Sequence, residues 1–184
     1  MDIAVVYESM FGNTHAVAEA IAAGIREADP AAYLTVTRVG AIPQADLGEV
    51  GLLVVGGPTH TLRMSSPRTR QQGLQAGHKA ADQPHREPEP GAAGPGIREW
   101  LDGLPAAQHG GWAAAFDTRL SYPLAGGAAR PAARQLRRRG YQLAADPEGF
   151  YVSGAEGPLQ DGELRRARAW GAMLAHQAAV PSAG

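Results

Sequence analysis

Cysteine is absent from this sequence of 184 residues, and its absence excludes several kinds of chemistry. Without thiols the chain has no disulfides, thiolate nucleophiles, iron–sulfur clusters or cysteine-based zinc sites. Any redox chemistry must therefore be carried by a bound organic cofactor. The absence gives no information about the cellular compartment.

Net charge and long apolar runs are also lacking. The 17 basic residues nearly balance the 18 acidic ones, so no global field attracts nucleic acid or an anionic membrane. No run could span a bilayer, and Met1-Asp2 leads directly into an apolar stretch without a signal-peptide pattern. His78 and His85 have no carboxylates at a metal-binding spacing. We therefore expect a soluble, cytoplasmic protein with no nucleic-acid partner, no membrane span and no metal site.

The hydrophobic content of the chain, 44% of its 184 residues, is enough for one domain with a full core. Short apolar or alternating runs predict strands at 3–7, 33–39, 52–55, 112–116 and 150–152. Helical periodicity and end signals predict helices at 13–29, 97–104, 128–139 and 161–179. The alternation predicts an α/β fold with a parallel sheet, right-handed crossovers and helices on both faces.

One segment departs from this pattern. Residues from about 62 to 96 are rich in Gln, Arg, Pro and Gly, and strong apolar residues are nearly absent from them. Such a composition buries too little apolar area to offset the entropy of ordering its backbone, roughly 1–2 kcal/mol per residue. We therefore predict a single domain over residues 1–180, with a flexible insertion at 62–96 and a disordered tail at 181–184.

A short polar loop follows the first predicted strand, and its composition suits a bound phosphate. Ser9, Asn13 and Thr14 supply side-chain donors, and Gly12 permits a tight turn. Such a loop binds phosphate through backbone N–H groups, hydroxyl groups and the positive end of the next helix dipole. Lys79 is the only lysine, so a nucleoside triphosphate loop is excluded, and the dinucleotide glycine fingerprint is absent as well. A mononucleotide is the better interpretation, with ordinary helix capping as the alternative.

The first strand, loop and helix together resemble a known family. The flavodoxin signature matches this chain at each defined position of the run Val5-Val6-Tyr7-x-Ser9-x-x-Gly12-x-Thr14-x-x-x-Ala18-x-x-Ile21. Downstream, Gly56-Gly57-Pro58-Thr59-His60 resembles the second flavin loop of that family, and Phe116-Asp117-Thr118-Arg119 stands where the third belongs. The resemblance implies a doubly wound, five-stranded parallel sheet in the order 2-1-3-4-5, with a long insertion after the third strand.

The same resemblance implies FMN as the cofactor and assigns residues to it. The phosphate would be wrapped by Ser9, Met10, Phe11, Gly12, Asn13 and Thr14. The isoalloxazine ring would lie between two further groups, Pro58, Thr59, His60 and Thr61 on one face and Phe116, Asp117, Thr118, Arg119 and Tyr122 on the other. His60 and Arg119 have an alternative interpretation as solvated loop residues.

Two departures from the family pattern affect the expected chemistry. Flavodoxins commonly clamp the ring between Trp and Tyr, whereas the second loop here carries His60. Flavodoxins are also usually strongly acidic, whereas this chain is nearly neutral. Four arginines are expected close to the flavin crevice, namely Arg63, Arg68, Arg70 and Arg119. We therefore expect the flavin to be easier to reduce than in acidic flavodoxins.

Three functions fit these patterns. The first is an FMN-binding, flavodoxin-like protein that carries electrons between redox partners. The second is an FMN-dependent NAD(P)H:quinone or protoporphyrinogen-type oxidoreductase, in which His60, Arg119 and the insertion form a substrate pocket. The third is a binding or regulatory module without flavin. The partner would be a redox protein or a small quinone-like acceptor, and the sequence assigns neither catalytic residues nor an oligomeric state.

Overall fold

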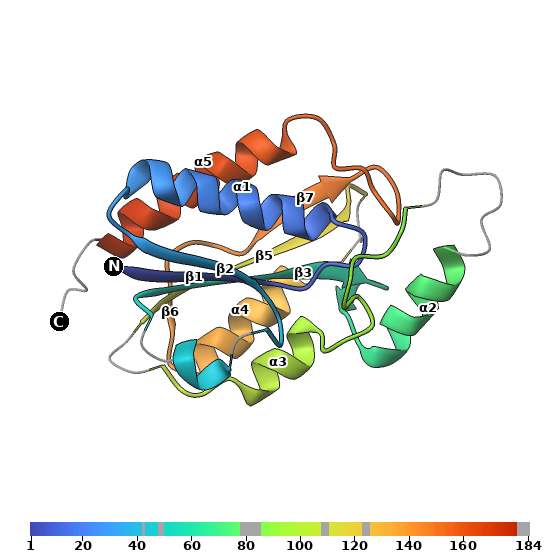
Figure 1. Ribbon diagram of the computed structural model, residues 1–184, viewed down its shortest axis with the longest axis horizontal. Coiled ribbons are helices and arrows are strands. Elements are labelled where there is room, and N and C mark those ends of the chain that lie inside the picture. The colour runs from blue at the N-terminus through green and yellow to red at the C-terminus, as the bar shows by residue number, and fades with distance from the viewer. Residues whose placement is uncertain (42, 48–49, 78–85, 108–110, 123–125, 180–184) are drawn as a thin grey trace.

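A central parallel sheet with helices on both faces forms the molecule (Figure 1). The computed structural model describes residues 1–41, 43–47, 50–77, 86–107, 111–122 and 126–179. The strands are β1 (Asp2–Tyr7), β2 (Tyr33–Arg38), β3 (Leu52–His60), β4 (Arg63–Met64), β5 (Trp112–Leu120), β6 (Gln142–Leu143) and β7 (Glu148–Val152). The helices are α1 (Asn13–Ala28), α2 (Pro67–Gly77), α3 (Ile97–Gly103), α4 (Ala129–Arg138), α5 (Glu163–Ala179) and the 3₁₀ turn η1 (Gln44–Leu47).

The sheet order confirms the predicted topology. The parallel strands run β2-β1-β3-β5-β6, which is the predicted order 2-1-3-4-5. Two segments share the fifth position, because β6 pairs with the beginning of β5 and β7 pairs with its end. The short strand β4 is an addition that pairs antiparallel with the end of β3.

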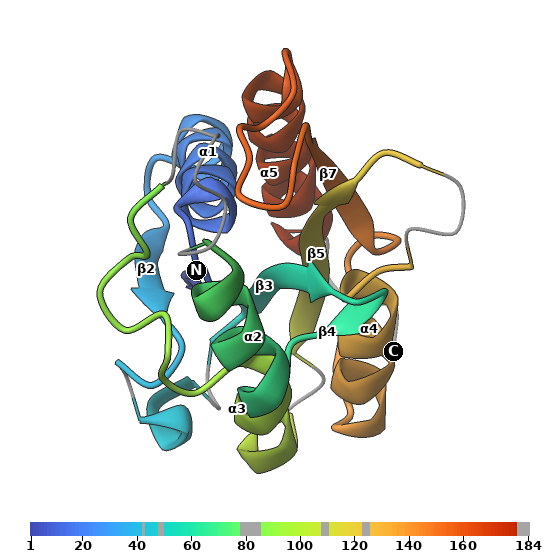
Figure 2. The ribbon, with the colours of Figure 1, turned by 90° about the vertical axis from the view of Figure 1, so that its right-hand side faces the viewer.

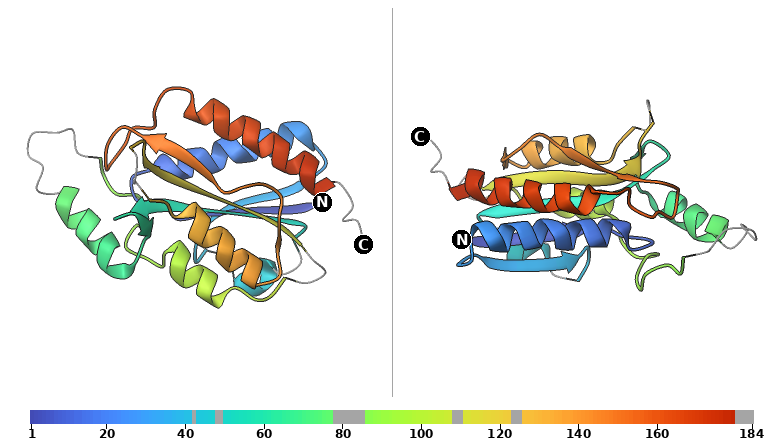
Figure 3. Two further views of the ribbon diagram at one scale, coloured as in Figure 1. Left: turned by 180° about the vertical axis from the view of Figure 1, so that it is seen from behind. Right: turned by 90° about the horizontal axis from the view of Figure 1, so that it is seen from above.

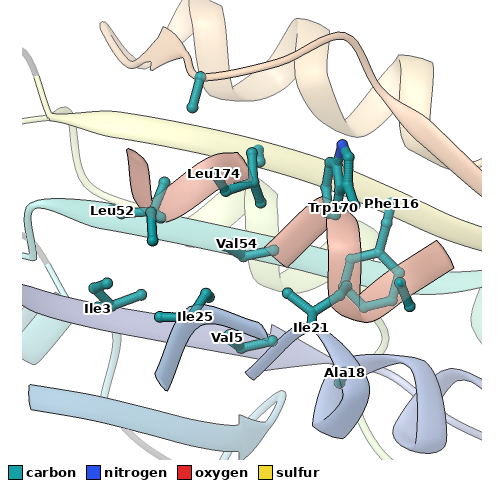
Figure 4. Close-up of a cluster of buried hydrophobic side chains, with 14 of the residues drawn as sticks. Ile3, Val5, Ala18, Ile21, Ile25, Leu52, Val54, Phe116, Trp170 and Leu174 are labelled. Carbon is teal, nitrogen blue, oxygen red and sulfur yellow. The ribbon is translucent and has the colours of Figure 1, made fainter. Parts of the chain in front are cut away.

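Two apolar layers hold the helices to the sheet. Helices α1 and α5 cover one face of the sheet, and α3 and α4 cover the other (Figures 1 and 3). Figure 4 shows the first layer, in which Ile21 of α1 and Trp170 of α5 meet Phe116 of β5. The central strands β1, β3 and β5 are covered on both faces, and this explains why their sequences are continuous apolar runs.

Helices α1 and α5 lie side by side along that face (Figure 3). A Cβ atom on Gly24 of α1 would lie 1.9 Å from the Arg168 carbonyl oxygen, and one on Gly171 of α5 would lie 2.1 Å from the Ile21 carbonyl oxygen. The missing side chains therefore let the two backbones approach closely. No helix in the described ranges is both long enough and apolar enough to cross a membrane.

The segment predicted as an insertion contains ordered elements where the structure describes it. It includes β4 and α2, and Met64, Ser65 and Arg70 are buried. The sequence carries a signal for α2, since Ser66 exchanges hydrogen bonds with Thr69 and Pro67 occupies the first helical position. Residues 78–85 and the predicted tail at 181–184 lie outside the described part, and the flexibility expected for both segments stays a prediction.

Candidate functional site

The carboxyl ends of β1, β3 and β5 meet at one edge of the sheet because the strands are parallel. Figure 2 looks onto this edge, with α2 in front of it. A cavity of about 1110 Å³ opens there. Small-molecule sites usually have volumes of roughly 300–1,000 Å³, so this cavity has room for a ligand the size of a nucleotide cofactor.

Most of the predicted site residues line this cavity. They come from three segments that are far apart in sequence, and they are Ser9, Met10, Phe11, Asn13, Thr14, Pro58, Thr59, His60, Thr61, Thr118, Arg119 and Tyr122. The topology alone brings these segments together, because the loops after β1, β3 and β5 leave the sheet at the same edge.

Gly12, Phe116 and Asp117 belong to the same segments but do not line the cavity. Gly12 begins α1 with a left-handed backbone, φ 86°. The Phe116 ring is 1% exposed and lies edge-on to Phe150, with 6.1 Å between centroids. The Asp117 carboxylate accepts the Ala129 N–H at 2.9 Å and so begins α4. Phe116 and Asp117 lie two residues before Thr118 and Arg119 in β5, so on each face of the strand they stand farther from the cavity at its carboxyl end.

The first loop presents the amino end of α1 to the cavity. Ser9 Oγ accepts the Gly12 N–H at 3.1 Å, and Gly12 takes the position that precedes the helix. Among the described residues, no side chain caps the first turn of α1, and no acidic residue lies in that turn. Thr14 Oγ1 lies 2.8 Å from Thr118 Oγ1 in this region. Uncapped N–H groups, hydroxyls and a helix dipole form a donor set that fits a phosphate.

Residues 86–92 pack over this loop. The Glu89 N–H donates to the Met10 carbonyl at 2.8 Å, and Arg86 lies 3.3 Å from Asn13 Oδ1. Burial opposes the charged form of Glu89, but hydrogen bonds from Ser9 and His15 outweigh it and lower the pKa of this carboxyl. The Arg38 guanidinium, 3.4 Å from Glu89 Oε2, balances the resulting carboxylate, and Arg86 adds a cation to the cavity wall that the sequence did not reveal.

The second loop is a tight hairpin with an unusual backbone. His60 pairs with Arg63, and the two residues between them, Thr61 and Leu62, have φ values of 47° and 70°. Such left-handed conformations at both positions usually require Asn or Gly, so this turn is strained. It is held in place partly by the Gly127 N–H, which donates to the Leu62 carbonyl at 3.1 Å. Burial lowers the pKa of His60, which keeps its imidazole neutral at neutral pH.

Further cavity walls come from segments outside the three predicted flavin loops. Helix α2, which lies in the insertion that the oxidoreductase alternative placed in a substrate pocket, contributes Thr69, Gln72 and Gly73. Residues 154–158, which the sequence did not indicate as part of the site, follow β7 at the same edge. Asn13 Nδ2 donates to the Glu156 carbonyl at 2.9 Å, which ties this last loop to the first one. The sequence did contain a signal for this loop, namely Gly154 and Gly157 after β7. Glycines near a strand's carboxyl end also mark the second loop, where they were interpreted as part of the site.

Charged side chains of both signs line the cavity. They are Arg86, Arg119 and Glu156, and Arg119 also lies 3.6 Å from the buried Asp117 carboxylate. Within the described ranges, no group of three or more His, Asp or Glu side chains is placed to hold a metal ion.

Comparison with solved structures reveals proteins of the same architecture. A flavodoxin from the domain Archaea aligns with a TM-score of 0.63 and 23% identity, covering 97% of this chain and 99% of its own. Oxidised flavodoxin 1 from Bacillus cereus aligns with a TM-score of 0.63 and 18% identity, covering 96% and 98%. The flavodoxin of Streptococcus pneumonia TIGR4 gives 0.64 and 16%, covering 96% and 99%. No protein-family model matches this sequence, and no curated protein sequence matches it either.

Proposed function

Because this chain has the flavodoxin fold, we propose that it binds FMN at the carboxyl edge of its sheet and carries electrons between redox partners. One observation carries the proposal: the uncapped amino end of α1, with hydroxyl groups on Ser9 and Thr14, opens into a cavity at the switch point of the sheet. A bound flavin would supply one- or two-electron chemistry.

In this proposal the chain's own residues divide into a phosphate part and a ring part. The backbone N–H groups and side chains of residues 9–14 hold the phosphate, and Arg86 adds a positive charge near it. Residues 58–61 and 118–119 flank the ring, with His60 as a neutral imidazole. Asp117 acts indirectly, by fixing the beginning of α4 beneath the third loop.

A titration that compares FMN with riboflavin tests the phosphate part directly. The two ligands share the ring and differ by the phosphate, so quenching of their fluorescence should show that FMN binds at least tenfold more tightly. Thr14→Val should weaken FMN binding by about tenfold, because a hydrogen bond to a charged group contributes about 1.5–3 kcal/mol. Riboflavin binding should stay unchanged in this variant.

Thr35→Val is the matched control, because it makes the same substitution in β2, away from the cavity. It should leave both affinities unchanged. A protein that leaves FMN fluorescence unchanged at high micromolar concentration would contradict the proposal and favour the third function, a flavin-free binding or regulatory module.

A second candidate function is an FMN-dependent NAD(P)H:quinone or protoporphyrinogen-type oxidoreductase. The cavity favours it in one respect, since α2 adds Thr69, Gln72 and Gly73 to the wall beyond the three loops assigned to the flavin. Oxidation of NAD(P)H with a quinone as acceptor separates the two functions. Turnover above that of unbound FMN would support the oxidoreductase, and its absence would leave the electron carrier.

A further inference from the structure

A second hollow adjoins the flavin cavity and has a volume of about 780 Å³. The two share a rim formed by Leu62, Arg119, Leu120 and Tyr122. The two hollows are therefore neighbours, with these four side chains at their common boundary.

Arginines from three elements converge on this hollow. Arg63 comes from β4, Arg119 from β5, and Arg130 and Arg134 from α4. The two residues of α4 are four positions apart, so they project from the same side of the helix. We call these residues the arginine cluster.

The positive charge of the arginine cluster is largely uncompensated. Among the described residues that line the hollow, none is acidic. Within the described ranges, Arg63, Arg130 and Arg134 have no carboxylate within ion-pair distance. Arg119 lies 3.6 Å from Asp117, but that carboxylate also accepts the Ala129 N–H. Guanidinium groups held together around a concavity attract a compact anion, and their planar donors match a carboxylate or a phosphate.

Two tyrosines give the hollow an aromatic character as well. The Arg119 guanidinium lies over the Tyr151 ring, 5.8 Å from its centroid. Tyr122 is 52% exposed and belongs to both the hollow and the flavin cavity. An exposed aromatic ring at the shared rim can pack against the ring of a ligand that passes from one space to the other.

We propose that the arginine cluster binds the anionic group, carboxylate or phosphate, of a small aromatic substrate whose ring extends past Tyr122 into the flavin cavity. The role of this ligand as a substrate rests on the proposed FMN function, whereas the anion site itself does not. The concave shape favours a small molecule over the acidic surface of a partner protein, which would meet the arginines across a flatter face.

Calorimetric titration of the flavin-free protein with matched probes tests the anion site. Naphthalene-2-sulfonate and naphthalene-2-sulfonamide share ring and size and differ by one charge. The sulfonate should bind at least tenfold more tightly. The double variant Arg63→Gln, Arg134→Gln should lose this preference, because each charged hydrogen bond contributes about a tenfold change in affinity.

A control variant separates local binding from general charge. Arg137→Gln, Arg138→Gln removes the same charge from the exposed end of α4, outside the hollow, and should change the affinity for the sulfonate less than twofold. Equal binding of the two probes by the unmodified protein would overturn the proposal. The arginines would then be better explained as a binding surface for an acidic partner protein. An equal loss in both double variants would overturn it too.

Two further titrations identify the anion and the position of the ring. Tighter binding of 2-naphthyl phosphate than of 2-naphthoate assigns the site to a phosphate, and the reverse assigns it to a carboxylate. In the FMN-loaded protein the bound sulfonate should shift the visible absorption band of the flavin, whereas binding without a shift would overturn the placement of the ring. FMN affinity is measured separately on the same samples, so failure of FMN binding and failure of the arginine cluster give different results.

Discussion

Glu8 shows how a single buried residue connects the first loop to the segments after β3. Its Oε2 accepts the Ser65 hydroxyl at 2.7 Å and the Ile97 N–H at 2.8 Å. Arg70 donates to Ser65 Oγ and, with its other terminal nitrogen, to Glu99. Within the described residues, Glu8 Oε1 has no hydrogen-bond partner. The carboxyl group therefore joins β1 to α2 and α3 while one of its oxygens stays unsatisfied.

Burial raises the pKa of Glu8, and this has a consequence for stability at different pH values. The folded state binds this proton more tightly than the unfolded state does. The stabilisation is therefore complete below the ordinary pKa of a glutamate and is lost as the pH rises through the raised pKa. Glu8→Gln stays neutral and keeps an acceptor oxygen, so its free energy of unfolding should fall less across this window.

Urea unfolding at a series of pH values measures this effect. Glu19→Gln, on the exposed side of α1, is the control and should follow the unmodified protein. Asp117, whose pKa is also raised by burial, contributes equally in all three proteins. If the free energy of unfolding of Glu8→Gln depended on pH in the same way as that of the unmodified protein, Glu8 would not be held in its protonated form.

Among the elements, the hairpin between β3 and β4 is the least expected from sequence and the most strained. Its central residues, Thr61 and Leu62, have positive φ values, although one is β-branched and the other bulky. Both also line the cavity at the carboxyl edge of the sheet. Strain of this kind persists where the surroundings hold it, and here the Ala128 N–H donates to Thr59 while Gly127 bonds to Leu62.

Replacement of the turn with its preferred residues should stabilise the fold. The double variant Thr61→Asn, Leu62→Gly places Asn-Gly in the turn, and we expect its free energy of unfolding to rise by about 1–2 kcal/mol. The matched control, Thr61→Ala, Leu62→Ala, keeps side chains that disfavour positive φ and should show no gain. Denaturant unfolding of both variants measures the difference, and equal stability of the two would contradict the strained turn.

For the whole molecule, the fold and most of the cavity were predictable from the sequence, and the reasons are physical. The continuous apolar runs of β1 and β3 and the glycine and hydroxyl residues of the first loop are local patterns, and parallel topology then brings the loops together. Phe116 was predicted to contact the flavin, but it is buried in the core, two residues back along β5 from Thr118, which lines the cavity. Arg86 and the 154–158 loop reach the cavity only through tertiary packing, which no local pattern encodes.

The near-neutral charge of the molecule predicts its redox behaviour once FMN is bound. With a formal charge of −1 and Arg119 in the cavity wall, the protein should favour the anionic reduced flavin more than acidic flavodoxins do. Arg119→Gln should make the potential of the second reduction step more negative, by about 1 kcal/mol or on the order of 40 mV.

Arg168→Gln changes the net charge equally but lies on α5, paired with Glu27, and serves as the control with little expected change. A spectroscopic redox titration of the FMN-loaded proteins measures all three potentials. A potential as strongly negative as that of acidic flavodoxins would refute the charge argument, and equal shifts in both variants would exclude a local role for Arg119.

The central claim is that the loop before α1 holds the FMN phosphate. A two-dimensional ¹H–¹⁵N NMR spectrum, recorded while FMN is added to labelled protein, tests it most directly. We expect the backbone amide signals of residues 10–14 to move strongly, while those of Asp29, Ala31 and Ala32, at the opposite end of α1, stay in place. A titration with FMN that leaves the signals of residues 10–14 unmoved would show that this loop does not hold the phosphate.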